Sequence, residues 1–296
     1  NQGCRKEDTG KGGRPPYDVV MMFKILVLQR LYNLSDDQTE YQINDRMSFM
    51  RFLGINLCEK VPDAKTIWKF KNDLAETETV DKLFCMFDEH LENKGLISHK
   101  GTIVDAPRQR NSRDENKKIK NGVIPEEWEK PENKSKLAQK DIDADWTKKN
   151  GERHFGYKDH VKCDADSKLI TNYSVTSASV HDSQRCLVFI GQEDEVLYAD
   201  SAYSGKPIAL ALPENCKNQI CEKGYRNSPL TSEQKMNNRR KSRIRCRIEQ
   251  IFGFMTGAMH GITIRSIGIT RAWMNIGITN LVYNFCRYSY LKRASA

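Results

Sequence analysis

The hydrophobic periodicity of this 296-residue chain changes once, near Gly101. Between Tyr17 and about Gly95 the apolar residues recur at three- and four-residue steps, which is typical of amphipathic helices. After Gly101 the apolar residues form short β-branched runs that alternate with helical segments. This change predicts an all-helical N-terminal region, independent in character, followed by an α/β region with a mixed sheet flanked by helices.

The same pattern predicts how the chain is divided. Residues 1–16 are rich in Gly, Lys and Arg and predict a flexible basic arm. Residues 17–100 form the helical region, and residues 101–270 form the α/β region. Within the α/β region, residues 108–149 are so polar that we expect a mobile loop. Residues 271–296 contain a last helix, expected to pack on the core.

Two capping boxes mark the start of helices. Ser35 with Gln38 begins a helix in the N-terminal region, and Thr231 with Gln234 begins a second one. The apolar stripe after the second box predicts one long, basic helix that runs to about Thr256.

Charge and cysteine content narrow the function classes. The formal net charge is +9, which favours a polyanionic partner, most often nucleic acid. The nine cysteines include no CxxC pair, so a zinc ribbon has no ligand framework. Their odd number, without a secretion signal, indicates a reducing, cytoplasmic location. The most apolar stretch is interrupted by Lys24, Gln29 and Arg30, so we expect no membrane span.

Two aspartates stand directly after predicted strands. Asp105 follows Thr102-Ile103-Val104, and Asp200 follows the run 196–199. An ionised carboxylate beside a buried strand costs several kcal/mol unless a cation accompanies it. For either aspartate alone, a simple loop or helix cap is the favoured interpretation.

A third carboxylate, Glu249, lies inside the otherwise basic helix after Thr231. Taken alone, Glu249 could merely pair with Arg245 four residues earlier. Together with Asp105 and Asp200, however, it predicts an oxygen-ligand site for two Mg²⁺ ions, with Mn²⁺ as a substitute. Two such ions can clamp the attacking and leaving oxygens of a phosphodiester.

At this point the sequence resembles the DDE transposases of bacterial insertion sequences, close to insertion-sequence family five. The matching stretches occur in family order, cover most of the chain and include GRPPYDVVMMFKILVLQRLYNLSDDQTEYQINDRMSFMRFLGI, PDAKTIWKFKNDL, GTIVDA, DADWTKKNGERHFGYKDHVKCD, TSASVHD, VLYADSAYSGK and RCRIEQIFG. The resemblance implies an RNase H-like catalytic domain with Asp105, Asp200 and Glu249 as its acidic residues and metal ligands, and with Arg245 in the signature before the glutamate.

The resemblance also implies what the protein does. It implies binding to terminal inverted repeats, metal-dependent cleavage at the transposon end and transfer of the freed 3′-hydroxyl to target DNA. Joining two ends favours a homodimer in a prokaryotic cell, associated with the nucleoid when bound to DNA. Two positions depart from related transposases: Ser242 stands where a Tyr is frequent, and Thr256 stands where a Lys is frequent.

Several residues are candidates for DNA contact. The basic helix offers phosphate contacts through Arg239, Arg240, Arg243 and Arg245. Lys158 and His160 share one face of a predicted strand and either line the active site or form an ordinary exposed face.

Two further segments carry candidates with open alternatives. Trp146 either stacks on an unpaired base or anchors its own segment on the domain. Residues 35–53 and 64–74, within the helical region 17–100 that we expect to bind DNA and dimerise, form either a helix-turn-helix, with Lys65 and Lys69 facing double-stranded DNA, or a helical dimerisation or docking module with solvated lysines. In the SVHD stretch, Asp182 is predicted to cap a short helix.

The sequence therefore predicts a transposase with Mg²⁺-dependent hydrolysis and transesterification. Two alternatives are a transposase-derived DNA-binding protein without catalysis and a stand-alone Mg²⁺-dependent nuclease. A plain transcriptional regulator is a third, and it requires residues 101–296 to be dispensable.

Overall fold

The computed structural model describes residues 16–111, 124–149, 151–261 and 263–294. Its N-terminal part is helical, as predicted, and comprises α1 (Val19–Leu31), α2 (Asp36–Asp45), α3 (Met47–Leu53), α4 (Ala64–Glu76) and α5 (Thr79–Asn93). The predicted box of Ser35 and Gln38 caps α2, and the Asp63 carboxylate caps α4. Gly54 ends α3 in the left-handed region, at φ 79°, where glycine carries no steric penalty.

A mixed sheet follows, with the strands β1 (Thr102–Asp105), β2 (Arg108–Asn111), β3 (Asp145–Lys149), β4 (Glu152–Asp164), β5 (Ile170–Ser177), β6 (Val196–Ala199), β7 (Lys217–Asn218) and β8 (Thr263–Ile264). The long strand β4 pairs antiparallel with β1 and β2 and also with β3 and β5. Strand β6 runs parallel to β1, and β7 runs parallel to β6. The predicted mixed sheet is confirmed.

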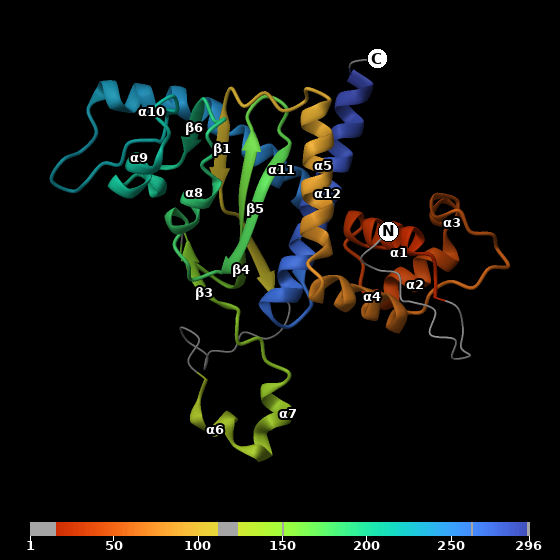
Figure 1. The fold of residues 1–296 in the computed structure, drawn as a ribbon. Coiled ribbons are helices and arrows are strands. Elements are labelled where there is room, and N and C mark those ends of the chain that lie inside the picture. Colours follow the sequence, from red (N-terminus) through yellow and green to blue (C-terminus); the bar gives the residue numbers. More distant parts are fainter. Residues whose placement is uncertain (1–15, 112–123, 150, 262, 295–296) are drawn as a thin grey trace.

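Helices cover both faces of the sheet (Figure 1). The remaining elements are α6 (Glu126–Glu129), η1 (Pro131–Asn133), α7 (Lys134–Leu137), α8 (Ser183–Phe189), η2 (Ser201–Tyr203), α9 (Lys206–Ala211), α10 (Ser232–Arg245), α11 (Arg247–Thr256) and α12 (Ile269–Ala294). Alternation along β1 sends Ile103 into the core with α11 and α12, and Val104 into the core with α8 and α9.

The N-terminal helices are not independent, contrary to the prediction. Residues of α1, α4 and α5 share one hydrophobic core with β5, α11 and α12. The rings of Phe84 and Tyr173 meet edge to face across this junction, with centroids 4.9 Å apart. Helix α12 lies between the N-terminal helices and the sheet (Figure 1). The expected last helix therefore packs on both parts of the chain.

The prediction of a single mobile loop over residues 108–149 is wrong, because this segment contains β2, α6, η1, α7 and β3. Strands β2 and β3 are polar in sequence, and they form because neighbouring strands supply backbone hydrogen bonds: β4 pairs with all of β3, and β4 and β8 together pair with β2. Residues 112–123 of this segment lie outside the described residues. The basic arm predicted for 1–16 also lies outside them, apart from residue 16.

Three local predictions need correction. The single long helix after Thr231 is wrong, because α10 and α11 are separated at Cys246. The sequence of residues 219–222 also predicts a weak strand, and the structure instead has β7 two residues earlier. The Asp182 side chain makes no capping hydrogen bond to α8 and instead forms an ion pair with Lys158, whose Nζ lies 2.8 Å from an Asp182 oxygen.

Candidate active site and nucleic-acid surface

Asp105 and Asp200 lie at the same edge of the sheet. Val104 and Ala199 are register partners in the parallel pair β1–β6, and each aspartate comes one residue later. Neighbouring strands are about 4.8 Å apart, so the two backbones start within reach of a shared ligand. One oxygen of each carboxylate accepts the next residue's N–H, from Ala106 at 2.8 Å and from Ser201 at 2.6 Å.

Glu249 reaches this edge on the first turn of α11. The break at Cys246 lets α10 pack against β6 while α11 packs against β1 and α12. Arg245, the last residue of α10, lies 3.2 Å from an Asp105 oxygen and 3.6 Å from a Glu249 oxygen. The local pair of Glu249 with Arg245 exists, and the same guanidinium also connects Glu249 to Asp105.

Tyr203 marks the common surroundings of the two aspartates. Its side chain is buried, and its hydroxyl has no hydrogen-bond partner among the described residues. Burial raises the pKa of this hydroxyl, and the negative charges of Asp105, Asp182 and Asp200 raise it further. Both sheet-edge aspartates therefore act electrostatically on one buried atom, although sequence reasoning did not select Tyr203.

Asp105, Asp200 and Glu249 do not form a group whose ligand atoms all lie within 4.8 Å of one another. In the described part of the chain, one group of three possible ligands has atoms within 4.8 Å of each other, and it is His99, Glu193 and Asp194. Lys162 balances one of the two carboxylate charges in that group, because its Nζ lies 3.0 Å from Asp194 and 3.7 Å from Glu193. Asp105 and Glu249 instead share the Arg245 guanidinium.

The basic face of α10 is open to solvent. Arg239, Arg240 and Arg243 are exposed, whereas Arg245 is held by the two carboxylates described above. Lys235, Arg239 and Arg243 follow at four-residue steps and line one shallow hollow. Sequence reasoning missed Lys235 as a site residue, although this spacing could have found it.

Lys158 and His160 do not form an exposed face. Lys158 is only 6% exposed, and its Nζ donates to the Val180 carbonyl at 2.6 Å as well as pairing with Asp182. The His160 ring is fully buried and shares a hydrogen bond with the Thr176 hydroxyl at 2.8 Å. Burial lowers the pKa of His160 to about 4, so at neutral pH its ring carries no charge for a phosphate. A direct DNA contact by either side chain is inconsistent with this arrangement.

The other candidates divide in the same way. Trp146 is half-buried in β3 and packs on Phe155, with ring centroids 5.3 Å apart, which agrees with the anchoring alternative. Lys65 and Lys69 are exposed on α4 and remain available to DNA.

Comparison with known families decides between the classes of protein that share this topology. Residues 96–285, more than half of the chain, match the family described as Transposase DDE domain. The chain belongs to the DDE transposases. Residues 4–73 of the transposase also match the family described as Transposase domain (DUF772). The match to the DDE domain, together with the mixed sheet, confirms the predicted RNase H-like fold.

One solved structure is similar to the transposase at low identity. It is the cryo-EM structure of a piggyBac transposase synaptic complex with hairpin DNA, 12% identical over 97% of this chain and 70% of that chain. Its TM-score of 0.43 is too low to support a conclusion about this chain. Among the described residues of the transposase, no helix is both long and apolar enough to cross a membrane.

Proposed function

We propose that this transposase binds the terminal inverted repeats of an insertion sequence and catalyses metal-dependent strand cleavage and strand transfer. The observation that supports the chemistry is the position of Asp105 and Asp200 one residue beyond a registered pair of parallel strands. Glu249 faces the same edge through a guanidinium that it shares with Asp105. The terminal repeats and the strand-transfer step come from the family resemblance.

The residues at this edge fit a hard divalent cation. All three side chains offer carboxylate oxygens, which Mg²⁺ and Mn²⁺ prefer to nitrogen or sulfur ligands. Asp105, Asp200 and Glu249 would hold the ions. Two bound ions would activate the attacking oxygen and neutralise charge on the phosphate.

The protein's own groups position these carboxylates. Backbone N–H groups fix one oxygen of Asp105 and one of Asp200, which removes rotational freedom before any ligand binds. Arg245 draws Asp105 and Glu249 toward each other from different elements. No side chain needs to attack the DNA covalently, so a nucleophilic Ser or Tyr is not part of the proposal.

We name the sheet edge at which Asp105, Asp200 and Glu249 lie the acidic edge. The basic hollow on α10 is proposed to hold the DNA backbone beside it, because α10 ends at Arg245, which pairs with Asp105 and Glu249. Two such molecules, each holding one transposon end, form the homodimer that joining two ends requires.

Replacing Arg239 and Arg243 together by Gln is expected to weaken binding to double-stranded DNA at every sequence. The logarithmic salt dependence of the affinity should become shallower by about two, since each lost phosphate contact removes roughly 0.9 from the slope. Fluorescence anisotropy over a salt series measures both quantities. The Lys292→Gln/Arg293→Gln double variant, exposed at the far end of α12, is the matched control. An unchanged slope in the α10 variant would contradict this surface assignment.

The DNA that flanks the gene provides the first test of the function. We expect short inverted repeats on both sides of the gene, with a small target duplication outside them, and these repeats supply the DNA substrate. The transposase incubated with a labelled repeat end and Mg²⁺ should nick the strand and then join it to a target duplex. Cleavage without joining would instead identify a nuclease, and binding without cleavage would identify a DNA-binding derivative.

A further inference from the structure

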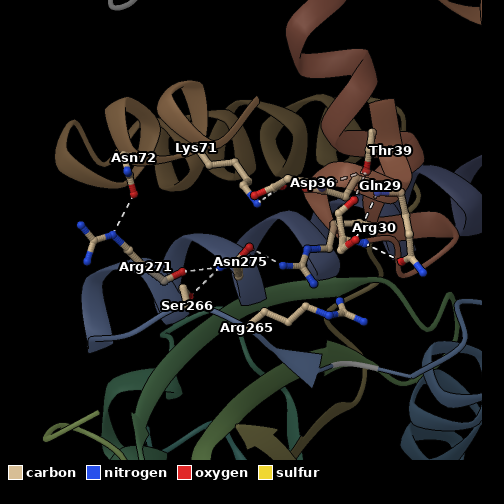
Figure 2. A network of polar contacts seen from close by, with 12 residues as sticks. Gln29, Arg30, Asp36, Thr39, Lys71, Asn72, Arg265, Ser266, Arg271 and Asn275 are labelled. Carbon is tan, nitrogen blue, oxygen red and sulfur yellow. Dashed lines mark hydrogen bonds and ion pairs between the residues drawn. The ribbon is translucent and has the colours of Figure 1, made fainter. Parts of the chain in front are cut away.

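A second polar site lies away from the acidic edge, where the N-terminal helices meet α12. It is a cavity of about 410 Å³ between α1, α2 and α4 on one side and the segment from β8 into α12 on the other (Figure 2). This volume falls within the range of ordinary ligand pockets. Neither the predicted DNA contacts nor the acidic edge includes this cavity.

The cavity carries an excess of positive charge. Four cationic side chains line it against two carboxylates, those of Asp36 and Asp37, and the cations are Arg30, Lys71, Arg265 and Arg271. Asp36 forms an ion pair with Lys71, so the Asp36 carboxylate already balances one of the four positive charges. The cavity wall therefore keeps a net positive charge at neutral pH.

The three arginines are held by neutral partners. Arg30 donates to the Asn275 side chain, and Arg265 donates to the Asn33 side chain at 3.0 Å. Arg271 donates from Nε to the Asn72 side chain at 2.7 Å. Within the described ranges, none of the three arginines forms an ion pair with a carboxylate. Each guanidinium has five N–H donors, so these bonds leave donors for a further acceptor.

The cations are close enough to disturb one another. Burial lowers the pKa of Arg30 to about 10, and the neighbouring charge of Arg265 adds to this effect. Burial likewise lowers the pKa of Lys71, against the opposing influence of Asp36. Arg30 therefore remains charged at neutral pH, and the burial of both cations costs free energy that a bound anion would offset.

Hydrogen bonds hold this arrangement in place before any ligand arrives. Asn275 accepts from Arg30 and donates to the Ser266 hydroxyl at 3.0 Å and to the Arg271 carbonyl at 2.8 Å. Side chains from α1, α4, α12 and the segment after β8 thus line the cavity together, with the Arg271 side chain directed toward Asn72 and the Arg265 side chain directed to the opposite side (Figure 2). A site organised in this way binds with a smaller loss of side-chain entropy.

The rim of the cavity has the composition of a nucleic-acid surface. Trp68 is 54% exposed and lines the cavity. Lys65, Trp68, Lys69 and Asn72 recur at three- and four-residue steps, so they share one face of α4. On this face, the exposed cations and the exposed ring lie next to Asn72, which accepts a hydrogen bond from Arg271. Bases stack on such rings, while lysines contact the backbone.

We propose that this cavity binds a phosphate group, and that in the working protein the phosphate belongs to the DNA backbone, with Trp68 against the adjoining nucleotide. The proposal rests on the proposed DNA-binding function and adds a contact point at the junction of the N-terminal helices and the catalytic part. Arg265 provides the donors on the catalytic side, Arg30 and Lys71 provide the charge on the other, and Arg271 adds a positive charge to the cavity wall beside Asn72.

Two probes test the site: inorganic phosphate, and a DNA duplex that contains a transposon end. At constant ionic strength, saturating phosphate should raise the melting midpoint of the full chain by about 3 °C or more over chloride. The Arg265→Gln/Arg271→Gln variant should lose this rise. The same variant should bind the duplex roughly tenfold more weakly, with a salt slope shallower by about one to two. Trp68→Ala should weaken duplex binding and leave the phosphate effect intact.

The Lys292→Gln/Arg293→Gln variant serves as the matched control, and Arg265→Lys/Arg271→Lys shows whether restored charge rescues binding. Circular dichroism identifies any variant that fails to fold. If the Gln double variant does not fold, the Arg265→Lys/Arg271→Lys variant replaces it, and its phosphate affinity is compared with that of the wild type. A phosphate effect without any change in duplex affinity overturns DNA as the source and leaves a free phosphate as the ligand. If neither probe responds to the cavity variants while the α10 variant still weakens duplex binding, the cavity proposal fails and the proposed function stands. If no form binds duplex, the proposed function fails, and the phosphate measurement alone decides the cavity.

Discussion

Asp105→Asn, Asp200→Asn and Glu249→Gln are each expected to abolish metal-dependent strand cleavage, while binding to the transposon end persists. Each change keeps the side chain's shape but removes one anionic ligand from the acidic edge. Metal ions contribute several kcal/mol of transition-state stabilisation, and each 1.36 kcal/mol is a factor of ten in rate. The cleavage rate should therefore fall by about a thousandfold or more. Denaturing gels of end-labelled DNA, in Mg²⁺ and in Mn²⁺, measure it.

Glu233→Gln is the control for these variants. Glu233 is an exposed acid in the first turn of α10, the helix that ends at Arg245, so its removal changes the net charge equally without touching the acidic edge. Its cleavage rate should stay within about twofold of wild type, because an exposed charge in a first helical turn contributes only a few tenths of a kcal/mol. Normal cleavage by all three acidic-edge variants would refute the catalytic assignment. Loss of end binding in all three would indicate that the carboxylates support the fold instead.

Local signals predicted the elements that position the acidic edge. A β-branched run before Asp105 and an apolar run before Asp200 were enough to place both strand ends, since buried strands are short and end at polar residues. Two capping boxes gave correct helix starts at Ser35 and Thr231, because each is a contact between residues three apart.

Contacts between distant residues explain what the sequence did not reveal. Cys246 ends α10 without a glycine or proline to signal it, because the break follows from packing against two different strands. The burial of Lys158 depends on Asp182, which lies 24 positions later and looked like a helix cap. The N-terminal helices looked independent because α12, which covers them, is nearly 200 residues away from α4. In each case the local sequence does not show which distant residue packs against the segment, and that contact decides the structure.

The contribution of Asp159 to the stability of the fold is expected to fall as the pH rises from 4 to 7, because this acid is buried. Asp159 is fully buried on β4, and one of its oxygens accepts a hydrogen bond from the Asn280 side chain at 3.1 Å. Its other oxygen has no partner among the described residues. Burial raises the pKa of Asp159 from 3.8 to about 7, with the Asn280 hydrogen bond opposing the rise.

The direction of the effect follows from proton counting. Between pH 4 and 7 the folded state keeps the Asp159 proton while the unfolded state has released it. The stability that Asp159 contributes therefore decreases with rising pH over this range and levels off above its folded-state pKa. The buried His160 acts in the opposite direction, because its pKa is lowered. The difference between the two pKa values of Asp159 corresponds to roughly 4 kcal/mol of unfolding free energy. Urea unfolding of the full chain at pH 4, 5.5, 7 and 8 measures it.

Asp159→Asn isolates this contribution, because the amide stays neutral at every pH. The stability of the variant relative to wild type should improve from pH 4 to pH 8 by an amount approaching that value. Taking the difference removes other groups, including Asp88, whose pKa burial also raises to about 7. Asp45→Asn, at an exposed position on α2, should show no such trend. A difference between Asp159→Asn and wild type that is flat across this pH range would mean that Asp159 is ionised in the fold, and that its second oxygen has a partner in solution.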